Sequence, residues 1–438
     1  MTVPGDLDLP LLRRQAFRRF AGGKLLHLLA QNALVYGIFI IVVSEQESAL
    51  ATSAFVMTGT IPSVLLSVPG GVVADALPRK LTIVAALAAR LALAAWLIDA
   101  EPGIVGIVAA AFAVFTALQF YGPAESAALA AVVEPRRMPA ANSMLNAVTL
   151  LAQVTGAGLV APLALKAYGE RGLFGTVFAL FALALVLFWS IPSLTPATGP
   201  KRARAGLFTS FPRGWRAITG DATLLRVTTL LVLLDSALLI IVVAAPSFIT
   251  DVLRTPAQNA VYIFAPGAVG VILGLIITPA LLKALPPRLI VTAGFVLVVG
   301  AVLTLPFIRE VSRELDERTF VPLREMQDWL RVRPEIAATA LLLPFGGLGM
   351  TMVKVAARTA VYNQAHPSEI AQVFATQSAI GSVVSLGPTL AAGALVDALD
   401  VRAVLVLTGI AMSALAILAL AGPMRPTPRV RTEVAPAA

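Results

Sequence analysis

The sequence has no cysteine and few charged residues, and both absences exclude whole classes of protein. Without cysteine, the chain can form no disulfide bond and no thiolate metal site. Only 13% of its 438 residues are charged, whereas 58% are hydrophobic. A soluble domain has about 25% charged and about 45–50% apolar residues. These proportions exclude a soluble fold and predict a protein that crosses a membrane many times.

Catalytic motifs are missing as well. The sequence has no HExxH, GxSxG or Walker loop, and it has only two histidines. We therefore expect no enzyme, no cofactor and no metal site; a membrane enzyme or a sensor fits this sequence poorly. The formal net charge of +9 would suit a nucleic-acid partner. In a membrane protein, however, Lys and Arg collect on cytoplasmic loops, so we expect no nucleic-acid binding.

Apolar runs bounded by charges, glycine or proline recur along the whole chain, and each is long enough for the ~20 residues that cross a bilayer. They predict an all-α polytopic membrane protein with twelve transmembrane helices. The first half (24–192) and the second half (223–421) would each form a six-helix bundle. The predicted spans are 24–43, 49–74, 81–99, 103–129, 141–165, 172–192, 223–249, 256–282, 288–308, 336–362, 370–396 and 402–421. The remaining segments would be an N-terminal arm (1–23), a basic linker (193–222), an insert on the non-cytoplasmic side of the membrane (309–335) and a C-terminal tail (422–438).

The positions of the cations predict the orientation. With the N-terminus in the cytoplasm, the cytoplasmic segments and the adjoining ends of the spans contain 20 Lys and Arg residues, against ten on the opposite side, of which six lie in the 309–335 insert. Because cytoplasmic loops are rich in Lys and Arg, both termini should be cytoplasmic. The N-terminal stretch is long and polar and has no small-residue cleavage site, so we interpret it as a retained arm and not a signal peptide.

The two halves also repeat each other. "ALPRKLTIV" (76–84) follows the second predicted span, and "ALPPRLIVT" (284–292) follows the eighth. "VVEPRRMPAANSM" (132–144) and "NQAHPSEIAQVFAT" (363–376) follow the fourth and tenth spans. A parallel six-plus-six repeat is typical of secondary transporters, whose substrate site lies between the repeats near the middle of the membrane.

A short loop motif indicates the family. "GGVVADALPRK" (70–80) resembles the loop between spans 2 and 3 of the major facilitator superfamily, with Gly71, Asp75, Pro78, Arg79 and Lys80 at its positions. The family form usually has Arg after the Asp and Gly in the turn, where this chain has Ala76 and Pro78. The stretches "LLRRQAFRRF" and "FYGPAESAALAAVVEPRRMPAANSM" resemble the drug and siderophore exporter branch that includes the enterobactin exporter.

This resemblance implies two pseudo-symmetric bundles that alternate their access to the two sides of the membrane. It also implies that Asp75 faces the N-terminal end of span 11 as a cytoplasmic latch, weakened by the missing Arg at position 76. In the fourth span, Thr116 stands where we would place the family's Arg ahead of Gln119, so proton coupling by that route is in doubt. Gly156 and Gly158 in span 5, and Gly387 and Pro388 in span 11, would allow close packing and bending.

Charges inside the predicted spans are the candidates for function, since an ionisable group at the bilayer centre is costly. Asp235 lies near the middle of span 7 and could carry a proton, bind a cationic cargo or pair with a buried cation. Lys354 in span 10 could pair with Asp235, bind an anionic group or extend to the interface.

Other polar residues complete the candidate set. Arg90, midway along span 3, is expected to bond a neighbouring helix, and His27 is expected at the cytoplasmic interface of span 1. Asn32 and Tyr36 in span 1 and Gln119 in span 4 could offer hydrogen bonds in a cavity or fill helix contacts. In the 309–335 insert, residues from Pro322 onward have an apolar face and a charged face, which predicts a short helix at the outer interface.

These features together predict a secondary active transporter of the plasma or bacterial inner membrane. We expect it to act as a monomer within the lipid bilayer and to export small amphiphilic molecules, drug-like or siderophore-like, with proton antiport as the driving reaction. The alternative is an importer or a lipid or lysolipid translocator on the same fold.

Overall fold

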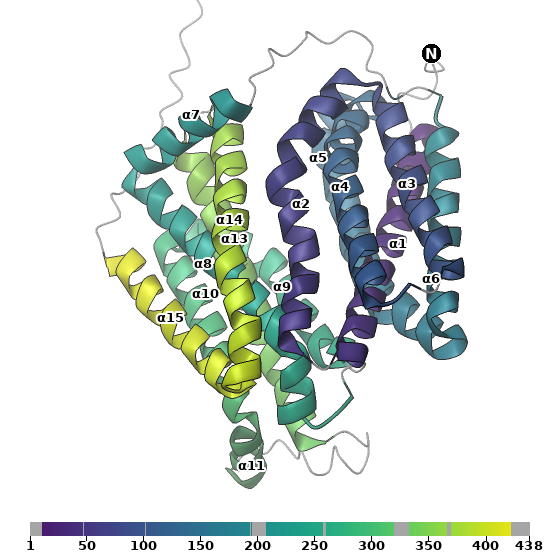
Figure 1. The fold of residues 1–438 in the computed structure, drawn as a ribbon. Helices are drawn as coiled ribbons and strands as arrows, with labels where there is room; N and C mark the ends of the chain where they lie inside the picture. Colours follow the sequence, from purple (N-terminus) through teal and green to yellow (C-terminus); the bar gives the residue numbers. More distant parts are fainter. Residues whose placement is uncertain are drawn as a thin grey trace, which may run out of the picture. The chain divides into compact units, whose positions relative to one another are not determined.

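A computed structural model of the 438-residue chain describes residues 11–46, 48–100, 102–192, 194, 207–256, 260–318, 333–365 and 369–421. All regular elements in these ranges are helical (Figure 1). Six long α-helices lie in the first half. They are α1 (Gln15–Gln46), α2 (Ala49–Ala76), α3 (Arg79–Asp99), α4 (Ile104–Val132), α5 (Met138–Thr155) and α6 (Ala161–Trp189).

The second half is helical in the same way. Its long helices are α8 (Ala222–Ser247), α9 (Ala260–Ala284), α10 (Pro287–Thr304), α13 (Pro334–Gln364), α14 (Ile370–Ala398) and α15 (Val401–Ala421). Two π-helical turns extend long helices: η3 (Gly156–Val160) joins α5 to α6, and η4 (Phe248–Val252) follows α8.

Most predicted spans agree closely with these bounds; span 2, for example, was expected at 49–74. However, α1 begins at Gln15 and not at 24, and α6 begins at Ala161, where span 5 was still expected. In the described part of the chain, eleven helical segments are long and apolar enough to cross a membrane. Predicted spans 5 and 6 fall in one of them, Ala140–Trp189, which is interrupted at Gly169. Gly169 has φ 66° and ψ −161°, a backbone conformation that glycine adopts without steric cost, so the chain turns there.

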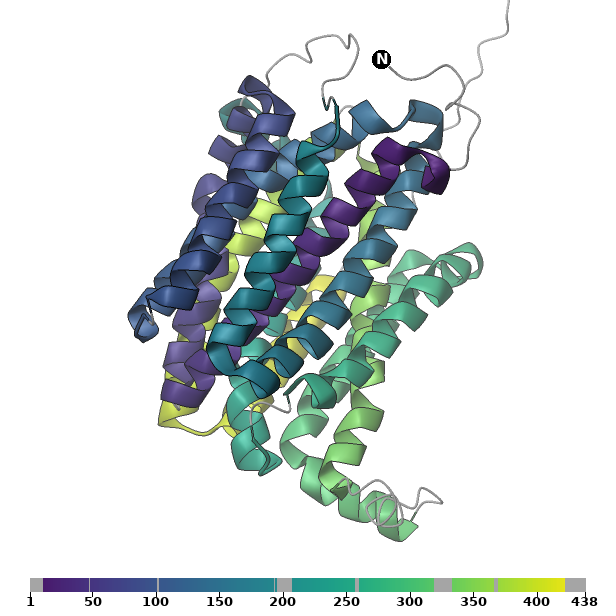
Figure 2. The ribbon, with the colours of Figure 1, turned by 90° about the vertical axis from the view of Figure 1, so that its right-hand side faces the viewer.

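Two described helices were not predicted. The basic linker contains α7 (Leu207–Gly220), which packs on α14: a Cβ at Gly214 would lie 2.6 Å from the carbonyl oxygen of Gln372. The insert begins with α11 (Ile308–Arg318), which packs on α13 at the end of unit 2 seen at the bottom of Figure 2. The predicted interface helix after Pro322 lies outside the described residues.

The helices form two compact units. Unit 1 is Met1–Gly206, Leu239–Ala265 and Leu386–Val404; unit 2 is Leu207–Leu238, Pro266–Ser385 and Leu405–Ala438. The unit boundaries therefore fall just before α7 and inside α8, α9, α14 and α15, and the one in α14 lies next to Gly387 and Pro388. In unit 1, α1 packs on α5 and α6, α2 on α4, and α3 on α4 and α6; in unit 2, α10 packs on α13.

Candidate functional sites

Asp235 and Lys354 form an ion pair in unit 2. Lys354 Nζ lies 2.9 Å from Asp235 Oδ1, which joins the middle of α8 to α13. Their side chains are 47% and 36% exposed, respectively, and both line a cavity of about 130 Å³. Of the three possibilities left open for Lys354, the structure shows the pair with Asp235. Because both groups remain accessible, each can exchange its partner for a bound ion or molecule.

Polar residues that the sequence did not single out surround this pair. Arg358 lies one turn after Lys354 on α13 and lines the same cavity. Gln377 of α14 also lines it and donates a buried hydrogen bond of 2.8 Å to Thr228 Oγ1 of α8. Two signals were present in the sequence: Arg358 is four residues after Lys354, and Thr228 is seven residues before Asp235, both same-face spacings on a helix. The remaining cavity residues are Leu231, Val232, Phe374 and Ser378.

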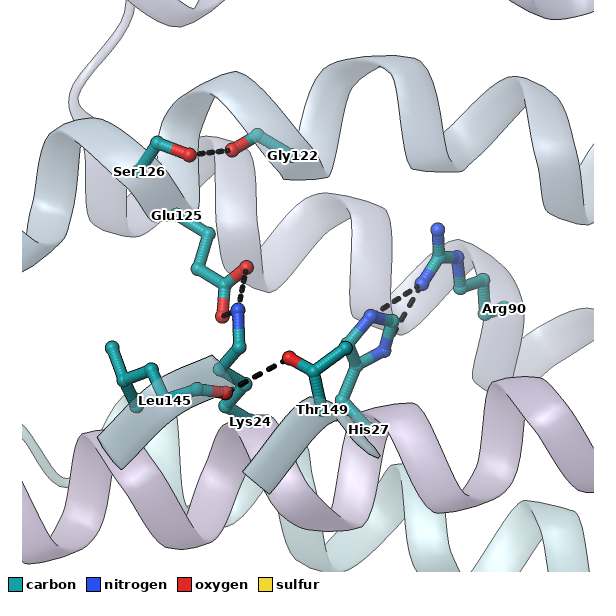
Figure 3. Close-up of polar contacts among 8 residues, drawn as sticks. All are labelled: Lys24, His27, Arg90, Gly122, Glu125, Ser126, Leu145 and Thr149. Atoms are coloured by element: carbon teal, nitrogen blue, oxygen red, sulfur yellow. Dashed lines mark hydrogen bonds and ion pairs between the residues drawn. The ribbon is translucent and has the colours of Figure 1, made fainter. Parts of the chain in front are cut away.

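A second charged cluster lies in unit 1, where Lys24 and His27 of α1 meet Glu125 of α4 and Arg90 of α3 (Figure 3). Lys24 Nζ lies 3.0 Å from both oxygens of Glu125, and these side chains are only 17% and 11% exposed. Arg90 Nη1 lies 3.0 Å from Nδ1 and 3.2 Å from Nε2 of His27. The ring of Tyr121 packs against that of His27 with a centroid distance of 4.1 Å and a tilt of 40°, and it lies 5.4 Å from the Arg90 guanidinium.

This cluster corrects the prediction for His27. Its side chain is fully buried, not interfacial, because Tyr121 and Phe181 pack against the ring. The prediction that Arg90 bonds a neighbouring helix is confirmed. Since arginine has donors only, the ring nitrogen of His27 that pairs with Arg90 must be an acceptor without a proton.

The cluster has more positive charge than negative charge. Lys24 and Arg90 contribute two cations and Glu125 one anion, and Arg90 Nε and Nη2 find no hydrogen-bond partner among the described residues. Buried charges are costly unless they are paired. Glu125 therefore compensates the charge of two cations. It contacts Lys24 directly and attracts Arg90 electrostatically across the protein interior.

The cations of the loop motif hold the ends of helices within unit 1. Arg79 Nη1 donates to the carbonyl of Ala127 in the last turns of α4 at 3.0 Å, and Lys80 Nζ donates to the carbonyl of Ile191 just beyond α6 at 2.7 Å. Cations close to the C-terminal end of a helix interact favourably with the negative end of its dipole, so both contacts are favourable. Pro78 precedes the first residue of α3. The side chain of Asp75 lies outside the described residues, and its role stays a prediction.

The other predicted residues make local contacts. Asn32 Nδ2 donates to the carbonyl of Leu28 at 2.7 Å, and Gln119 Nε2 donates to that of Phe115 at 3.4 Å. Tyr36 is partly buried against the core of unit 1. The amide nitrogens of Asn32 and Gln119 therefore bond within their own helices, and a role of these residues in a cavity stays a prediction.

The predicted glycines occupy distinct environments. Gly156 begins the π-helical turn and packs closely on α1: a Cβ there would lie 2.8 Å from the carbonyl oxygen of Leu29. Gly158 lies in the same π-turn. Gly387 and Pro388 lie within α14, and a Cβ at Gly387 would meet no atom within 4 Å among those described. Close packing therefore explains Gly156 but not Gly387.

Comparison with known proteins identifies the family. A model of the Major Facilitator Superfamily matches residues 22–388. The chain belongs to this superfamily. It is therefore a secondary transporter, not an enzyme, and moves small molecules by alternating access. No curated protein sequence matches the chain.

Solved structures of superfamily transporters share the fold. A mutant of the nucleoside transporter NupG has a TM-score of 0.72 at 11% identity, covering 92% of this chain and 98% of that one. An auto-inhibited POT family peptide transporter has a TM-score of 0.70 at 14% identity, and the match covers 94% of this chain and 98% of that one. The third structure is a bacterial homolog of the human lysosomal transporter Spinster in an inward-facing, unoccupied conformation. It has a TM-score of 0.66 at 12% identity, and the match covers 93% of this chain and 96% of that one. At such low sequence identity, the similarity to these structures shows a shared fold and nothing about the substrate.

Proposed function

We propose that this transporter exports small amphiphilic molecules in exchange for protons, and that Asp235 is the group for which cargo and proton compete. The observation that carries the proposal is the accessible ion pair of Asp235 and Lys354 within helices that cross the membrane. An ionisable pair at this depth is costly and marks a substrate or ion pathway.

The pair provides a simple exchange reaction. With neither ligand bound, Lys354 neutralises the Asp235 carboxylate. A cationic group of the cargo can replace Lys354 as the partner of the carboxylate. A proton that binds to Asp235 converts the carboxylate to a neutral acid, which removes the attraction for the cargo cation and releases it. Because one carboxylate serves both ligands, proton entry is tied to cargo exit.

The walls of the cavity support an amphiphilic cargo. Leu231, Val232 and Phe374 offer apolar surface beside the charged pair. The resemblance to the drug and siderophore exporter branch supports the same substrate class. The excess of cations in the predicted cytoplasmic segments supports a plasma or bacterial inner membrane location with both termini in the cytoplasm.

The test uses purified full-length protein in vesicles with an imposed pH gradient and the lipophilic cation tetraphenylphosphonium as the probe. Asp235→Asn should reduce gradient-driven probe movement to that of protein-free vesicles while the protein remains folded. Asp251→Asn, which changes an aspartate of η4 outside this cavity, is the matched control and should transport normally. Unchanged transport by Asp235→Asn would falsify the proposal.

One observation favours the alternative function, uptake of an anionic molecule such as a lysophospholipid. Lys354 and Arg358 place two cations one helical turn apart at the cavity. An anionic cargo would bind them when Asp235 is protonated, so proton and cargo would move in the same direction. Movement of a labelled lysophospholipid with the proton, and none of the lipophilic cation against it, would establish this alternative.

A further inference from the structure

The C-terminal end of α14 caps the N-terminus of α2, although nearly 350 residues separate them. Asp397, the last residue but one of α14, accepts hydrogen bonds through Oδ2 from Ser48 Oγ at 2.8 Å and from the Leu50 N–H at 3.0 Å. Its Oδ1 accepts from the Ala49 N–H at 2.8 Å. We name these contacts the Asp397 cap; all of them lie within unit 1.

The Asp397 cap supplies an anionic hydrogen-bond acceptor, which the first turn of α2 itself lacks. The first backbone N–H groups of a helix have no partner within the helix, and they form the positive end of its dipole. The first turn of α2 contains no acidic residue, and its own cap, Ser48, accepts only weakly from Leu50 and Ala51 at 3.2 and 3.4 Å. A carboxylate accepts hydrogen bonds from these N–H groups and is also attracted by the positive end of the dipole.

Contact between the two helices continues beyond the cap. One turn further along α2, Ser53 Oγ donates to the carbonyl of Thr389 at 3.1 Å. Between these points lies Gly393, where a Cβ would collide with Ser53 Oγ and lie 2.7 Å from the carbonyl oxygen of Ala49. The helices therefore approach as closely as they do because position 393 has no side chain.

The two helices belong to opposite halves of the repeat, yet this end of α14 is part of unit 1. The boundary between the units falls between Ser385 and Leu386, just before Gly387 and Pro388. Proline in a helix interior removes a backbone hydrogen bond and permits a bend. The C-terminal part of α14 can thus be held by α2 while the N-terminal part stays with unit 2.

We propose that Asp397 is a positioning residue of the transport cycle, whose cap on α2 holds this end of the transporter closed. Alternating access requires that helices of the two halves separate at one end of the molecule and then rejoin. The Asp397 cap is reversible, since water can replace each of its hydrogen bonds when the helices part. The proposal requires only alternating access and does not depend on the cargo or on Asp235.

The absence of cysteine makes the test direct. Spin labels at Leu50→Cys and Leu399→Cys, both at exposed positions, report the distance between α2 and the end of α14 in the purified full chain, without cargo or gradient. Asp397→Ala should shift the ratio of long to short distances toward the long ones by about three- to thirtyfold, the equivalent of losing one helix cap.

Two further variants make the outcome decisive. Asp397→Asn keeps an oxygen acceptor, so its shift should lie between those of the unchanged chain and Asp397→Ala; it also serves if the alanine variant fails to fold. Asp400→Asn removes a nearby carboxylate that is not part of the cap and should leave the ratio unchanged. Identical distances with and without the Asp397 carboxylate, or an equal shift from Asp400→Asn, would overturn the proposal.

Discussion

Two charged clusters lie in the membrane-crossing helices, and they differ in access. Arg90 and His27 are fully buried in unit 1, whereas Asp235 and Lys354 are 47% and 36% exposed beside a cavity in unit 2. Burial makes a charged group dependent on its protein partners, because water cannot replace a lost contact. Exposure lets a group exchange partners at small cost. We therefore expect the buried cluster to stabilise the fold, and we propose the accessible pair for transport.

The largest effect is expected from Glu125→Gln. This change removes the carboxylate that Lys24 contacts, so the buried Arg90 and the partly buried Lys24 lose their compensating anion. Breaking a buried pair by removing one partner costs about 3–5 kcal/mol. Thermal unfolding of the purified protein should show a large loss of stability.

The double variant Lys24→Met, Glu125→Gln provides the control for that experiment. It removes one cation together with the anion, so it should recover part of the lost stability. If Glu125→Gln unfolds at the same temperature as the unchanged protein, the buried cluster does not have the stabilising role assigned to it.

The accessible pair was predictable from the sequence, and the buried cluster was not. Asp235 stands alone within a long apolar run, so its depth in the membrane could be inferred from its position in that run. Lys24 is the first residue of the first predicted span and lies close to the cations of the N-terminal arm, so its position in the sequence does not indicate burial. Nothing in the sequence indicates that α3 brings Arg90 to His27, because contacts between helices depend on packing and not on periodicity. The i, i+3 spacing of Lys24 and His27 was the only local signal.

The same contrast holds for the fold. Apolar runs ending at glycine, proline or charge indicated the long helices, and most predicted bounds agree within four residues. The start of α1 and the junction of α5 with α6 differ by about ten residues from the predicted bounds. The amphipathic helices α7 and α11 were missed, because their charged residues resemble a loop when composition alone is considered. For the second transmembrane helix, the resemblance predicted a latch at the C-terminal end, at Asp75. The structure describes a cap at its N-terminal end, provided by Asp397 from a distant segment.

An intermediate effect is expected from His27→Phe. Phenylalanine retains a ring to pack against Tyr121 and Phe181 but offers no acceptor to Arg90. A buried polar group that loses its partner costs about 1–3 kcal/mol. His27→Gln keeps an acceptor and should lose less stability in the same unfolding measurement. A smaller loss for His27→Phe than for His27→Gln would show that ring packing, and not the bond to Arg90, explains the buried histidine.

The smallest change in stability is expected from the double variant Asp235→Asn, Lys354→Gln. Partly exposed ion pairs contribute about 0.2–1 kcal/mol, so the unfolding temperature should change little. Transport of the lipophilic cation against a pH gradient should nevertheless be lost, because the carboxylate that cargo and proton share is gone. The comparison between the clusters would fail if this variant unfolded as readily as Glu125→Gln. In that case the pair in unit 2 would serve mainly to hold α8 against α13.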